Sequence, residues 1–229
     1  MRIAAIETST RAASVALLEG ATLVAAQPLP DQAGTAAALA PAIEHAVSRA
    51  GWRMADLELV AVSIGPGSFT GLRVGVTTAK SLAYALGCEV LGVDSLEVVA
   101  AQAQHAGDVC SVLDAQRGQL FCGRYRFDAA GESEVREAPR IVDPPQWIDS
   151  LAAGELVTGP GLRRVASGLP GGIPLAPEAV WLPRAETVGR LAGRQFAAGR
   201  RSDCWSLSPK YLRPSAAEER RDATGRNVS

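Results

Sequence analysis

Short apolar runs separated by turn residues begin the chain. The runs at residues 3–6, 14–18 and 23–26 alternate with polar or glycine-containing segments, which predicts an antiparallel meander of strands. Apolar residues at four-residue spacing then predict a helix from Thr35 to Ala50. Beyond it, strand and helix patterns alternate to about His105, and a meander followed by such alternation predicts a mixed sheet with helices packed on it.

The most continuous apolar run, residues 59–64, leads through a Gly-Pro-Gly turn into a long helical pattern. A run of this kind, rich in β-branched residues, is typical of a strand buried on both faces of a parallel sheet. Ser68 or Thr70 can accept hydrogen bonds from the first free amides of the helix, and Gly87 can end it. We take this strand, turn and helix as the centre of the predicted fold.

Small residues form a stripe along that helix. Gly71, Gly75 and Ala79 follow one another at four-residue spacing and so share a face. A glycine inside a helix costs about 1 kcal/mol relative to alanine, so close approach of another backbone should compensate. Two partners for the stripe stay open: the sheet of this chain, or a helix of another subunit.

The glycine-rich turn before the helix also suggests an anion site, because free amides at a helix N-terminus point at whatever binds there. The P-loop pattern is absent, however, since no Gly-Lys-Ser/Thr sequence follows the turn and Arg73 lies inside the helix. The turn alone is therefore weak evidence for phosphate binding.

A second unit repeats the opening theme. Residues 109–114 form an apolar run that ends in a carboxylate and is followed by a polar turn and another strand pattern, much as residues 3–7 do. The echo suggests two related lobes. We expect an N-terminal lobe over residues 1–107, a C-terminal lobe over 108–215 and a disordered charged tail over 216–229.

Two further helices are expected to begin at capping residues. Ser95 can cap a helix that runs to about His105, and Thr187 can cap a last helix over residues 188–198. The last helix falls within the predicted C-terminal lobe.

Composition and charge limit the classes of function. The net charge is −1, and a free-standing nucleic-acid binder normally carries a basic excess, so any nucleic acid would have to be held mainly by a partner. The four cysteines are scattered without a Cys-x-x-Cys pair, which predicts reduced thiols in a cytoplasmic protein. We expect neither a signal peptide nor a membrane-spanning segment, because no apolar stretch approaches about 20 residues.

A carboxylate and hydroxyls end the first predicted strand, at Glu7, Thr8 and Ser9. Such a group could hold a metal-bound phosphate, with Asp114 as its counterpart in the second lobe. The alternative is that these polar residues only finish their strands. Neither of the two histidines has the neighbours of a zinc site or of a Ser-His-Asp arrangement, so we nominate no catalytic residue and no metal ligand.

The most specific motif is Gly-Pro-Gly-Ser-Phe-Thr-Gly-Leu-Arg-Val-Gly at residues 65–75, followed by Ala-Lys-Ser-Leu-Ala at 79–83. Shorter motifs lie at residues 3–10, 91–96, 113–118 and 209–213. Together they resemble the TsaB (YeaZ) family of bacterial tRNA threonylcarbamoyladenosine biosynthesis proteins. The resemblance extends to about residue 213 and is strongest in the first half of the chain.

The resemblance implies an α/β fold with the two lobes and mixed sheets of the actin-like ATPase and sugar-kinase (ribonuclease H-like) superfold. It also implies a non-catalytic scaffold for the paralogue TsaD. TsaD transfers a threonylcarbamoyl group from threonylcarbamoyl-adenylate to N6 of the adenosine beside the anticodon, in tRNAs that read codons starting with A. The ATPase TsaE joins the complex, so ATP and the adenylate are used by the complex, and no cofactor is expected on this chain.

In that family the helices of the N-terminal lobe contact TsaD and also form homodimers. On this sequence the contact falls on the two helices predicted around Leu39 and Gly75. The predicted interface residues are Leu39, Ile43, Gly71, Leu72, Gly75, Val76 and Ala79. The small-residue stripe would then pack against another subunit.

Two departures from the family pattern argue against a nucleotide site in this chain. The family's first strand usually ends in Asp where this chain has Glu7, and a histidine before the first helix is replaced by Thr35. Glu7, Thr8, Ser9 and Asp114 are then a vestigial nucleotide site. The alternative function is a small magnesium-dependent phosphotransferase or ATPase that uses Glu7, Asp114 and the glycine-rich turn, and the scarcity of convergent catalytic groups argues against it.

Overall fold

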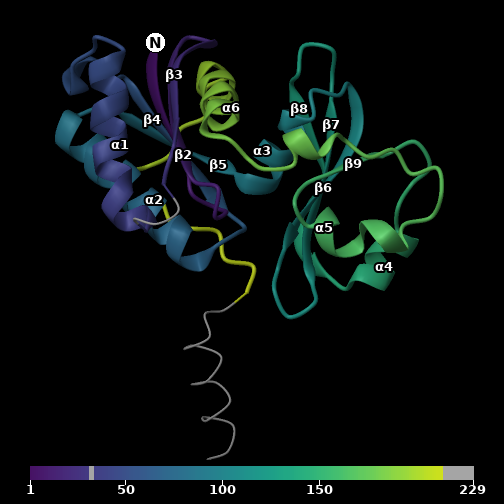
Figure 1. The fold of residues 1–229 in the computed structure, drawn as a ribbon. Coiled ribbons are helices and arrows are strands. Elements are labelled where there is room, and N and C mark those ends of the chain that lie inside the picture. The colour runs from purple at the N-terminus through teal and green to yellow at the C-terminus, as the bar shows by residue number, and fades with distance from the viewer. Residues whose placement is uncertain (31–33, 214–229) are drawn as a thin grey trace, which may run out of the picture.

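The computed structural model describes residues 1–30 and 34–213. Over these residues the chain forms two lobes that lie side by side, each built around one β-sheet (Figure 1). The predicted fold class, a two-lobed α/β fold with mixed sheets, is confirmed. The tail predicted to be disordered at residues 216–229 lies outside the described residues.

The first lobe contains a five-stranded sheet in the order β3-β2-β1-β4-β5. Its strands are β1 (Arg2–Glu7), β2 (Ser14–Glu19), β3 (Thr22–Pro28), β4 (Leu59–Gly65) and β5 (Glu89–Asp94). The first three strands pair antiparallel, which confirms the predicted meander, and β4 and β5 continue the sheet in parallel with β1. Because β4 lies between β1 and β5 and is covered on both faces, its apolar run is almost fully buried.

Two helices cover one face of this sheet, α1 (Thr35–Arg49) and α2 (Phe69–Leu86). Ser68 caps α2, because its hydroxyl accepts a hydrogen bond from the Gly71 amide at 3.2 Å. Gly87 ends the helix in the left-handed conformation that glycine adopts easily. Both ends of α2 therefore lie where the sequence predicts them.

The opposite face of the first sheet is covered by α6 (Ala185–Ala197), which follows the second lobe in sequence (Figure 1). Val188 and Leu191 pack there in one core cluster with Ile3 and Leu18. The prediction that residues 108–215 form the C-terminal lobe is wrong for this helix, because its apolar stripe fits the first sheet. The helix also begins earlier than predicted, with Arg184 rather than Thr187 at the N-cap position.

Helix α3 (Ser95–Gln102) contacts both sheets. The predicted cap at Ser95 is wrong: Asp94 caps the helix, since its Oδ1 accepts hydrogen bonds from the amides of Leu96 (2.9 Å) and Glu97 (3.4 Å). The Ser95 hydroxyl instead accepts a hydrogen bond from the Gly65 amide at 3.0 Å, and so fixes the start of the glycine-rich turn.

The second lobe contains a four-stranded sheet in the order β8-β7-β6-β9. Its strands are β6 (Gly107–Asp114), β7 (Leu120–Phe127), β8 (Ser133–Val142) and β9 (Leu156–Thr158), and its helices are α4 (Pro144–Asp149) and α5 (Leu162–Val165). Short 3₁₀ turns occur at Met54–Asp56 in the first lobe and at Ala166–Gly168 and Glu178–Val180 in the second. The fully buried Trp147 lies at the centre of the second core.

After α6, residues 202–213 run along the first lobe and reach the second; we call them the C-terminal strap. The Lys210 amide donates a hydrogen bond to the Ile64 carbonyl at 2.7 Å, at the end of β4. Arg213 Nη1 donates to the Ala115 carbonyl at 2.6 Å, just after β6. The strap therefore links the ends of two strands that belong to different lobes.

Candidate functional site

The small-residue stripe of α2 packs on the end of β1 in the same chain. A Cβ at Gly71 would lie 2.1 Å from the Thr8 carbonyl oxygen, and a Cβ at Gly75 would lie 2.2 Å from Thr8 Oγ1. Both distances are far below an allowed contact, so a side chain at Gly71 would clash with a backbone atom, and one at Gly75 would fit only if the Thr8 hydroxyl turned away. The sequence left two partners open for the stripe, and in the structure the stripe packs on this chain's own sheet.

The predicted interface residues do not form an exposed surface. All of them are buried inside the first lobe: Leu39, Ile43, Gly71, Leu72, Gly75, Val76 and Ala79. The prediction is corrected for a simple physical reason. Small and apolar residues at helical spacing mark the face of a helix that packs closely, and here that face is turned toward the helix's own sheet.

The exposed faces of the same two helices remain available for contact with another protein. We call them the helix surface. Its exposed residues are Ala37, Ala40, Pro41, Glu44 and His45 on α1, and Thr70, Arg73, Thr77, Ser81 and Tyr84 on α2. α1 and α2 contact each other, so these residues form one continuous face (Figure 1). In the sequence, the helix surface corresponds to the small and polar positions that lie between the apolar ones, and the prediction from the small-residue stripe did not use them.

An aromatic pair lies at one end of the helix surface. The side chains of Tyr84 and Trp205 are 69% and 74% exposed, and their rings meet edge to face with centroids 5.3 Å apart. Exposed aromatic side chains of this size are frequent anchors in protein interfaces. Trp205 belongs to the C-terminal strap, so the strap adds to the face that α2 presents.

Glu7 is completely buried, and its carboxylate is turned onto its own loop. Its Oε1 accepts hydrogen bonds from the amide and from the hydroxyl of Ser9, each at 2.6 Å. Its Oε2 has no hydrogen-bond partner among the described residues. Burial raises the pKa of Glu7 above its ordinary value, because the charged form loses its hydration.

The glycine-rich turn is occupied by contacts within the chain. The Ser68 amide donates a hydrogen bond to the Ser9 carbonyl at 2.7 Å, and a Cβ at Gly67 would lie 2.4 Å from that same carbonyl oxygen. The Gly65 amide donates to Ser95 as described above. The Ser68 amide thus holds the turn on the loop after β1, and the Gly65 amide holds it on the start of α3, so neither is free for an anion.

Asp114, the predicted counterpart of Glu7, is held by other groups. Its two carboxylate oxygens accept hydrogen bonds from Arg164 Nη1, both at 2.9 Å, and Oδ1 also accepts from the Gln116 amide at 2.8 Å. No group of three or more Asp, Glu, His or Cys side chains suited to a metal ion occurs in residues 1–30 and 34–213. The residues present therefore do not fit the magnesium site that the alternative function needs.

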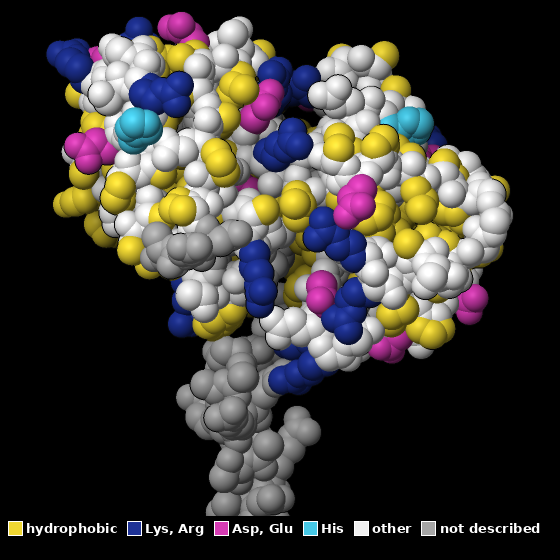
Figure 2. Space-filling model, in the orientation of Figure 1, with side chains coloured by type: hydrophobic (Ala, Val, Ile, Leu, Met, Phe, Trp, Pro, Cys, Tyr) yellow, Lys and Arg dark blue, Asp and Glu magenta, His cyan; other side chains and the backbone are white. Residues whose placement is uncertain are grey.

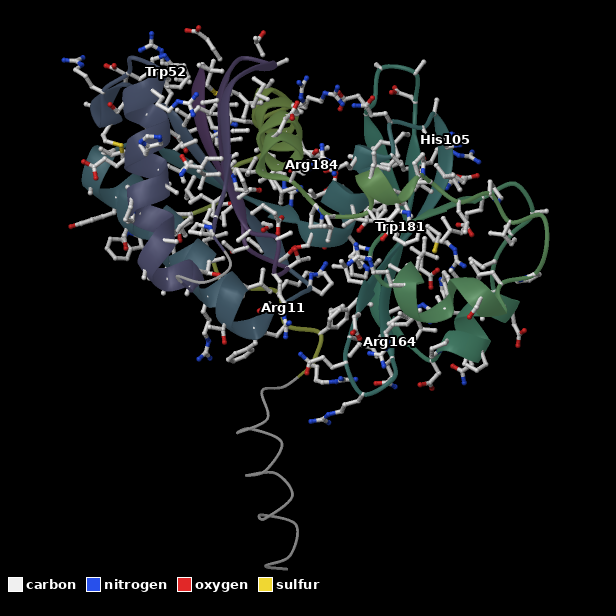
Figure 3. All side chains as sticks on the ribbon, viewed as in Figure 1. Arg11, Trp52, His105, Arg164, Trp181 and Arg184 are labelled. Carbon is white, nitrogen blue, oxygen red and sulfur yellow. The ribbon has the colours of Figure 1, made fainter. Side chains whose placement is uncertain are left out.

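A cleft of about 1150 Å³ separates the two lobes. The loop after β1 lines one side with Ser9, Thr10 and Arg11, and residues 113–117 line the other. Figure 2 shows lysine and arginine side chains along the boundary between the lobes, and Figure 3 places Arg11 and Arg164 on its two sides. Glu7 and Thr8 are not among the residues that line the cleft.

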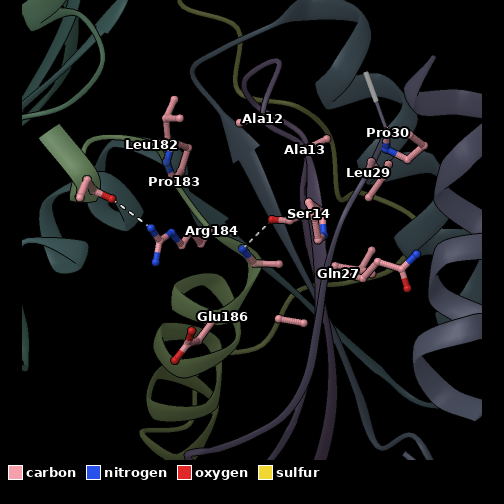
Figure 4. A pocket seen from close by; sticks show the side chains of 15 residues that line it. Ala12, Ala13, Ser14, Gln27, Leu29, Pro30, Leu182, Pro183, Arg184 and Glu186 are labelled. Carbon is pink, nitrogen blue, oxygen red and sulfur yellow. Dashed lines mark hydrogen bonds between the residues drawn. The ribbon is translucent and has the colours of Figure 1, made fainter. Parts of the chain in front are cut away.

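A second groove of about 620 Å³ lies where strands β2 and β3 face the segment leading into α6 (Figure 4). Its walls are mainly apolar, with Ala13 and Leu29 on the strand side and Pro183 opposite. The Ser14 hydroxyl accepts a hydrogen bond from the Ala185 amide at 3.1 Å, as Figure 4 shows. This hydrogen bond ties the segment to the first sheet, and the residues that line the groove bring no catalytic pair together.

None of the described helices is both long and apolar enough to cross a membrane. The two histidines, His45 and His105, are exposed on different lobes. Cys88, Cys110, Cys122 and Cys204 are free thiols.

A family model and several curated relatives all point to proteins of tRNA threonylcarbamoyladenosine biosynthesis. Residues 30–153 match the family model described as TsaD, tRNA N6-adenosine threonylcarbamoyltransferase. The chain is 32% identical over 224 residues to the tRNA threonylcarbamoyladenosine biosynthesis protein TsaB of Escherichia coli, which covers 95% of this chain and 96% of that protein. It is 36% identical over 128 residues to the TsaB of Bacillus subtilis, 56% of each chain.

The similar solved structures include two that are described by the name YeaZ. A Pseudomonas aeruginosa protein described as similar to the peptidase YeaZ superposes with a TM-score of 0.80 at 28% identity, covering 93% of this chain and 99% of that one. A structure named YeaZ from Pseudomonas aeruginosa superposes with a TM-score of 0.78 at 27% identity, covering 92% of this chain and 99% of that one.

Proposed function

Because the chain belongs to the TsaB (YeaZ) family of tRNA threonylcarbamoyladenosine biosynthesis proteins, we propose that it is a non-catalytic scaffold subunit that TsaD requires. In this proposal TsaD carries out threonylcarbamoyl transfer to N6 of the adenosine beside the anticodon. TsaE and tRNA join through the complex, which consumes ATP and threonylcarbamoyl-adenylate in the cytoplasm.

One observation carries the non-catalytic part of this proposal. The two carboxylates at the ends of β1 and β6 are both engaged within the chain: Glu7 Oε1 accepts hydrogen bonds from Ser9, and both oxygens of Asp114 accept from Arg164. An acid–base or metal-dependent reaction needs such groups to converge on a substrate. Here Glu7 does not line the cleft between the lobes and Asp114 is neutralised by Arg164, which argues against the magnesium-dependent phosphotransferase alternative.

The helix surface is the face that we assign to TsaD. It consists largely of small and polar side chains, which allow helices of another protein to approach closely, and it ends in the exposed pair Tyr84 and Trp205. The same face would serve a homodimer, so TsaD and a second copy of this chain would compete for it. The buried glycines of α2 support this face from behind by holding the helix on β1.

The test of the scaffold role is threonylcarbamoyl transfer to tRNA by TsaD from the same organism. TsaD is supplied with threonylcarbamoyl-adenylate, TsaE and ATP, with and without this chain. We expect transfer to depend on the chain, and the chain alone to hydrolyse no ATP. Equal transfer by TsaD without the chain would contradict the scaffold role.

The surface assignment has its own variant. Ala40→Arg places a long charged side chain on the exposed face of α1 without entering the core, and we expect it to weaken TsaD binding at least about tenfold. Ala197→Arg makes the same change at an exposed position of α6 and should leave binding unchanged. Titration calorimetry with purified TsaD measures both, and unchanged affinity of the Ala40 variant would move the contact elsewhere.

A further inference from the structure

We propose that Cys88 and Cys204 are a thiol pair that a low-molecular-weight disulfide oxidises to an intramolecular disulfide, which fastens the C-terminal strap to the first lobe. Both cysteines are free thiols in the structure. Neither is among the residues that line the cleft between the lobes. The pair is therefore a modification site that goes beyond the scaffold function.

A short antiparallel contact places the two cysteines opposite each other. Val90 of β5 forms a bridge with Ser202 of the strap, and the Gly92 amide donates a hydrogen bond to the Ser202 hydroxyl at 3.2 Å. Cys88 lies two residues before Val90, and Cys204 lies two residues after Ser202. In an antiparallel pair such positions face each other, and their side chains point to the same side.

The spacing of the two backbones suits a disulfide. Facing residues of an antiparallel pair have Cα atoms about 4.5–5.5 Å apart, and disulfides span Cα separations of about 4.4–6.8 Å. The strap begins a turn at Cys204, so the two cysteines stand where the chains part. Cys204 Sγ donates a hydrogen bond to the Lys80 carbonyl at 3.4 Å. Rotation of this side chain about its Cα–Cβ bond turns the sulfur from α2 toward Cys88.

The surroundings of the two thiols also make them neighbours. Both side chains are partly buried against the same core cluster of the first lobe. Burial raises the pKa of Cys88, and the charges of Glu89 and Cys204 raise it further. Because the interaction between two charges falls with distance, this influence of Cys204 agrees with the position that the antiparallel contact gives it.

The other two cysteines provide a comparison within the same chain. The sulfurs of Cys110 and Cys122 are 3.6 Å apart, but both residues are fully buried in the second lobe. Cys88 and Cys204 are only partly buried, so a small solute reaches them without opening a core. We therefore expect oxidation to select Cys88 and Cys204, although the buried pair has close sulfurs.

The oxidation is thiol–disulfide exchange with a small disulfide such as oxidised glutathione. The thiolate of one cysteine attacks a glutathione sulfur, the S–S bond of oxidised glutathione breaks, and one glutathione leaves. The second cysteine, as its thiolate, attacks the protein sulfur of the mixed disulfide, and the second glutathione leaves. Two protein thiols are oxidised, one glutathione disulfide is reduced, and the two protein protons end on the two glutathione thiols.

The bond would change how the strap is held. In the reduced protein Lys80 Nζ donates to the carbonyls of Trp205 and Leu207, each at 3.0 Å. A covalent link at Cys204 lies directly beside Trp205, so it would also fix the aromatic pair of Trp205 and Tyr84. The link would close a loop that contains α3, the second lobe and α6. Closing so long a loop removes conformational entropy from the unfolded chain and stabilises the folded one.

The experiment uses the full chain with oxidised glutathione as the probe, at about pH 8, where an ordinary thiol is partly ionised. Remaining thiols are alkylated in urea, and the peptides are mapped by mass spectrometry. We expect a peptide that links Cys88 to Cys204 and is released by dithiothreitol, with Cys110 and Cys122 recovered in alkylated form. The oxidised chain should melt about 5–15 °C higher than the reduced chain. Hydrogen exchange should slow at the amides of the strap.

Cys88→Ser and Cys204→Ser each remove one partner of the bond. Each variant should take up one glutathione at the remaining cysteine of the pair, form no linked peptide and gain no melting temperature on oxidation. Thermal melts of the reduced variants show that they are folded. Slower exchange in the strap should occur in the oxidised wild type and in neither variant.

Four results would overturn the proposal. The first is recovery of all four cysteines as thiols after exposure to oxidised glutathione. The second is glutathione on both Cys88 and Cys204 without a link between them, or a link that forms only when urea is present during oxidation. The third is a link between two chains, seen as a dimer on a non-reducing gel. The fourth is a link between Cys110 and Cys122 in the folded protein. None of these involves TsaD, so the scaffold role and this modification site fail or stand separately.

Discussion

Thr8 fills the space that a side chain at Gly71 or Gly75 would need. The two glycines meet different atoms of this threonine: the backbone oxygen faces Gly71, and the rotatable hydroxyl faces Gly75. The Thr8 backbone oxygen, directly after β1, cannot move aside unless the chain shifts, whereas the hydroxyl can turn. The two positions should therefore respond differently to the same substitution.

Gly71→Ala should lower the free energy of unfolding by about 2–3 kcal/mol, and Gly75→Ala by less, because only the first strains the end of β1. Gly171→Ala is the control, since a Cβ there meets nothing within 4 Å. Urea unfolding followed by circular dichroism measures all three. Equal losses at Gly71 and Gly75, or none, would contradict the packing against Thr8.

Glu7 should make stability depend on pH. Its pKa in the folded protein is raised by burial above the ordinary value of 4.5. Because the pKa of Glu7 is higher in the folded protein than in the unfolded chain, the folded protein keeps its proton at a pH where the unfolded chain has lost it. The wild type should therefore lose stability relative to Glu7→Gln as the pH rises from about 4.5 through the folded pKa. Urea unfolding of both proteins between about pH 4 and 7 measures the difference. A difference that stays constant across this range would contradict the buried carboxylate.

At the scale of elements, periodicity predicted the helices and strands of the first lobe well, because each amphipathic pattern reports its own buried face. It could not say which surface that face meets. The Gly71, Gly75 and Ala79 stripe could meet this chain or another, and α6 could cover either sheet. Caps were less certain still, because Asp94 and Ser95 are both good capping residues and only the backbone geometry decides between them.

The placement of α6 gives a prediction at this scale. Leu191 is 4% exposed and packs on the first sheet, so Leu191→Ala should lower the free energy of unfolding by about 2–4 kcal/mol. Hydrogen exchange should quicken at the amides of β1 and β2. Arg190→Ala, next to it but exposed, is the control. If exchange quickened only in the β6–β7 hairpin, α6 would pack on the second lobe, and its placement on the first sheet would be contradicted.

At the scale of the whole molecule, the two lobes share the parts that join them. α3 contacts both sheets, and the C-terminal strap connects the end of β4 with the turn after β6. The short motif at residues 209–213 marked this segment in the sequence, but nothing in its composition predicted that it would line a cleft. Such contacts depend on how distant segments meet, and local periodicity carries no information about that.

Helix α6, which covers one face of the first sheet, is synthesised long after the strands of that sheet. When β5 has emerged, α1 and α2 can already close one face, but the face formed by Ile3 and Leu18 waits for α6 at residues 185–197. At roughly 5–20 residues per second, that apolar face stays open for about 5–20 s on every nascent chain. During translation the half-made protein is thus a natural client for chaperones, and pauses between the codons for β5 and α6 would lengthen its exposure.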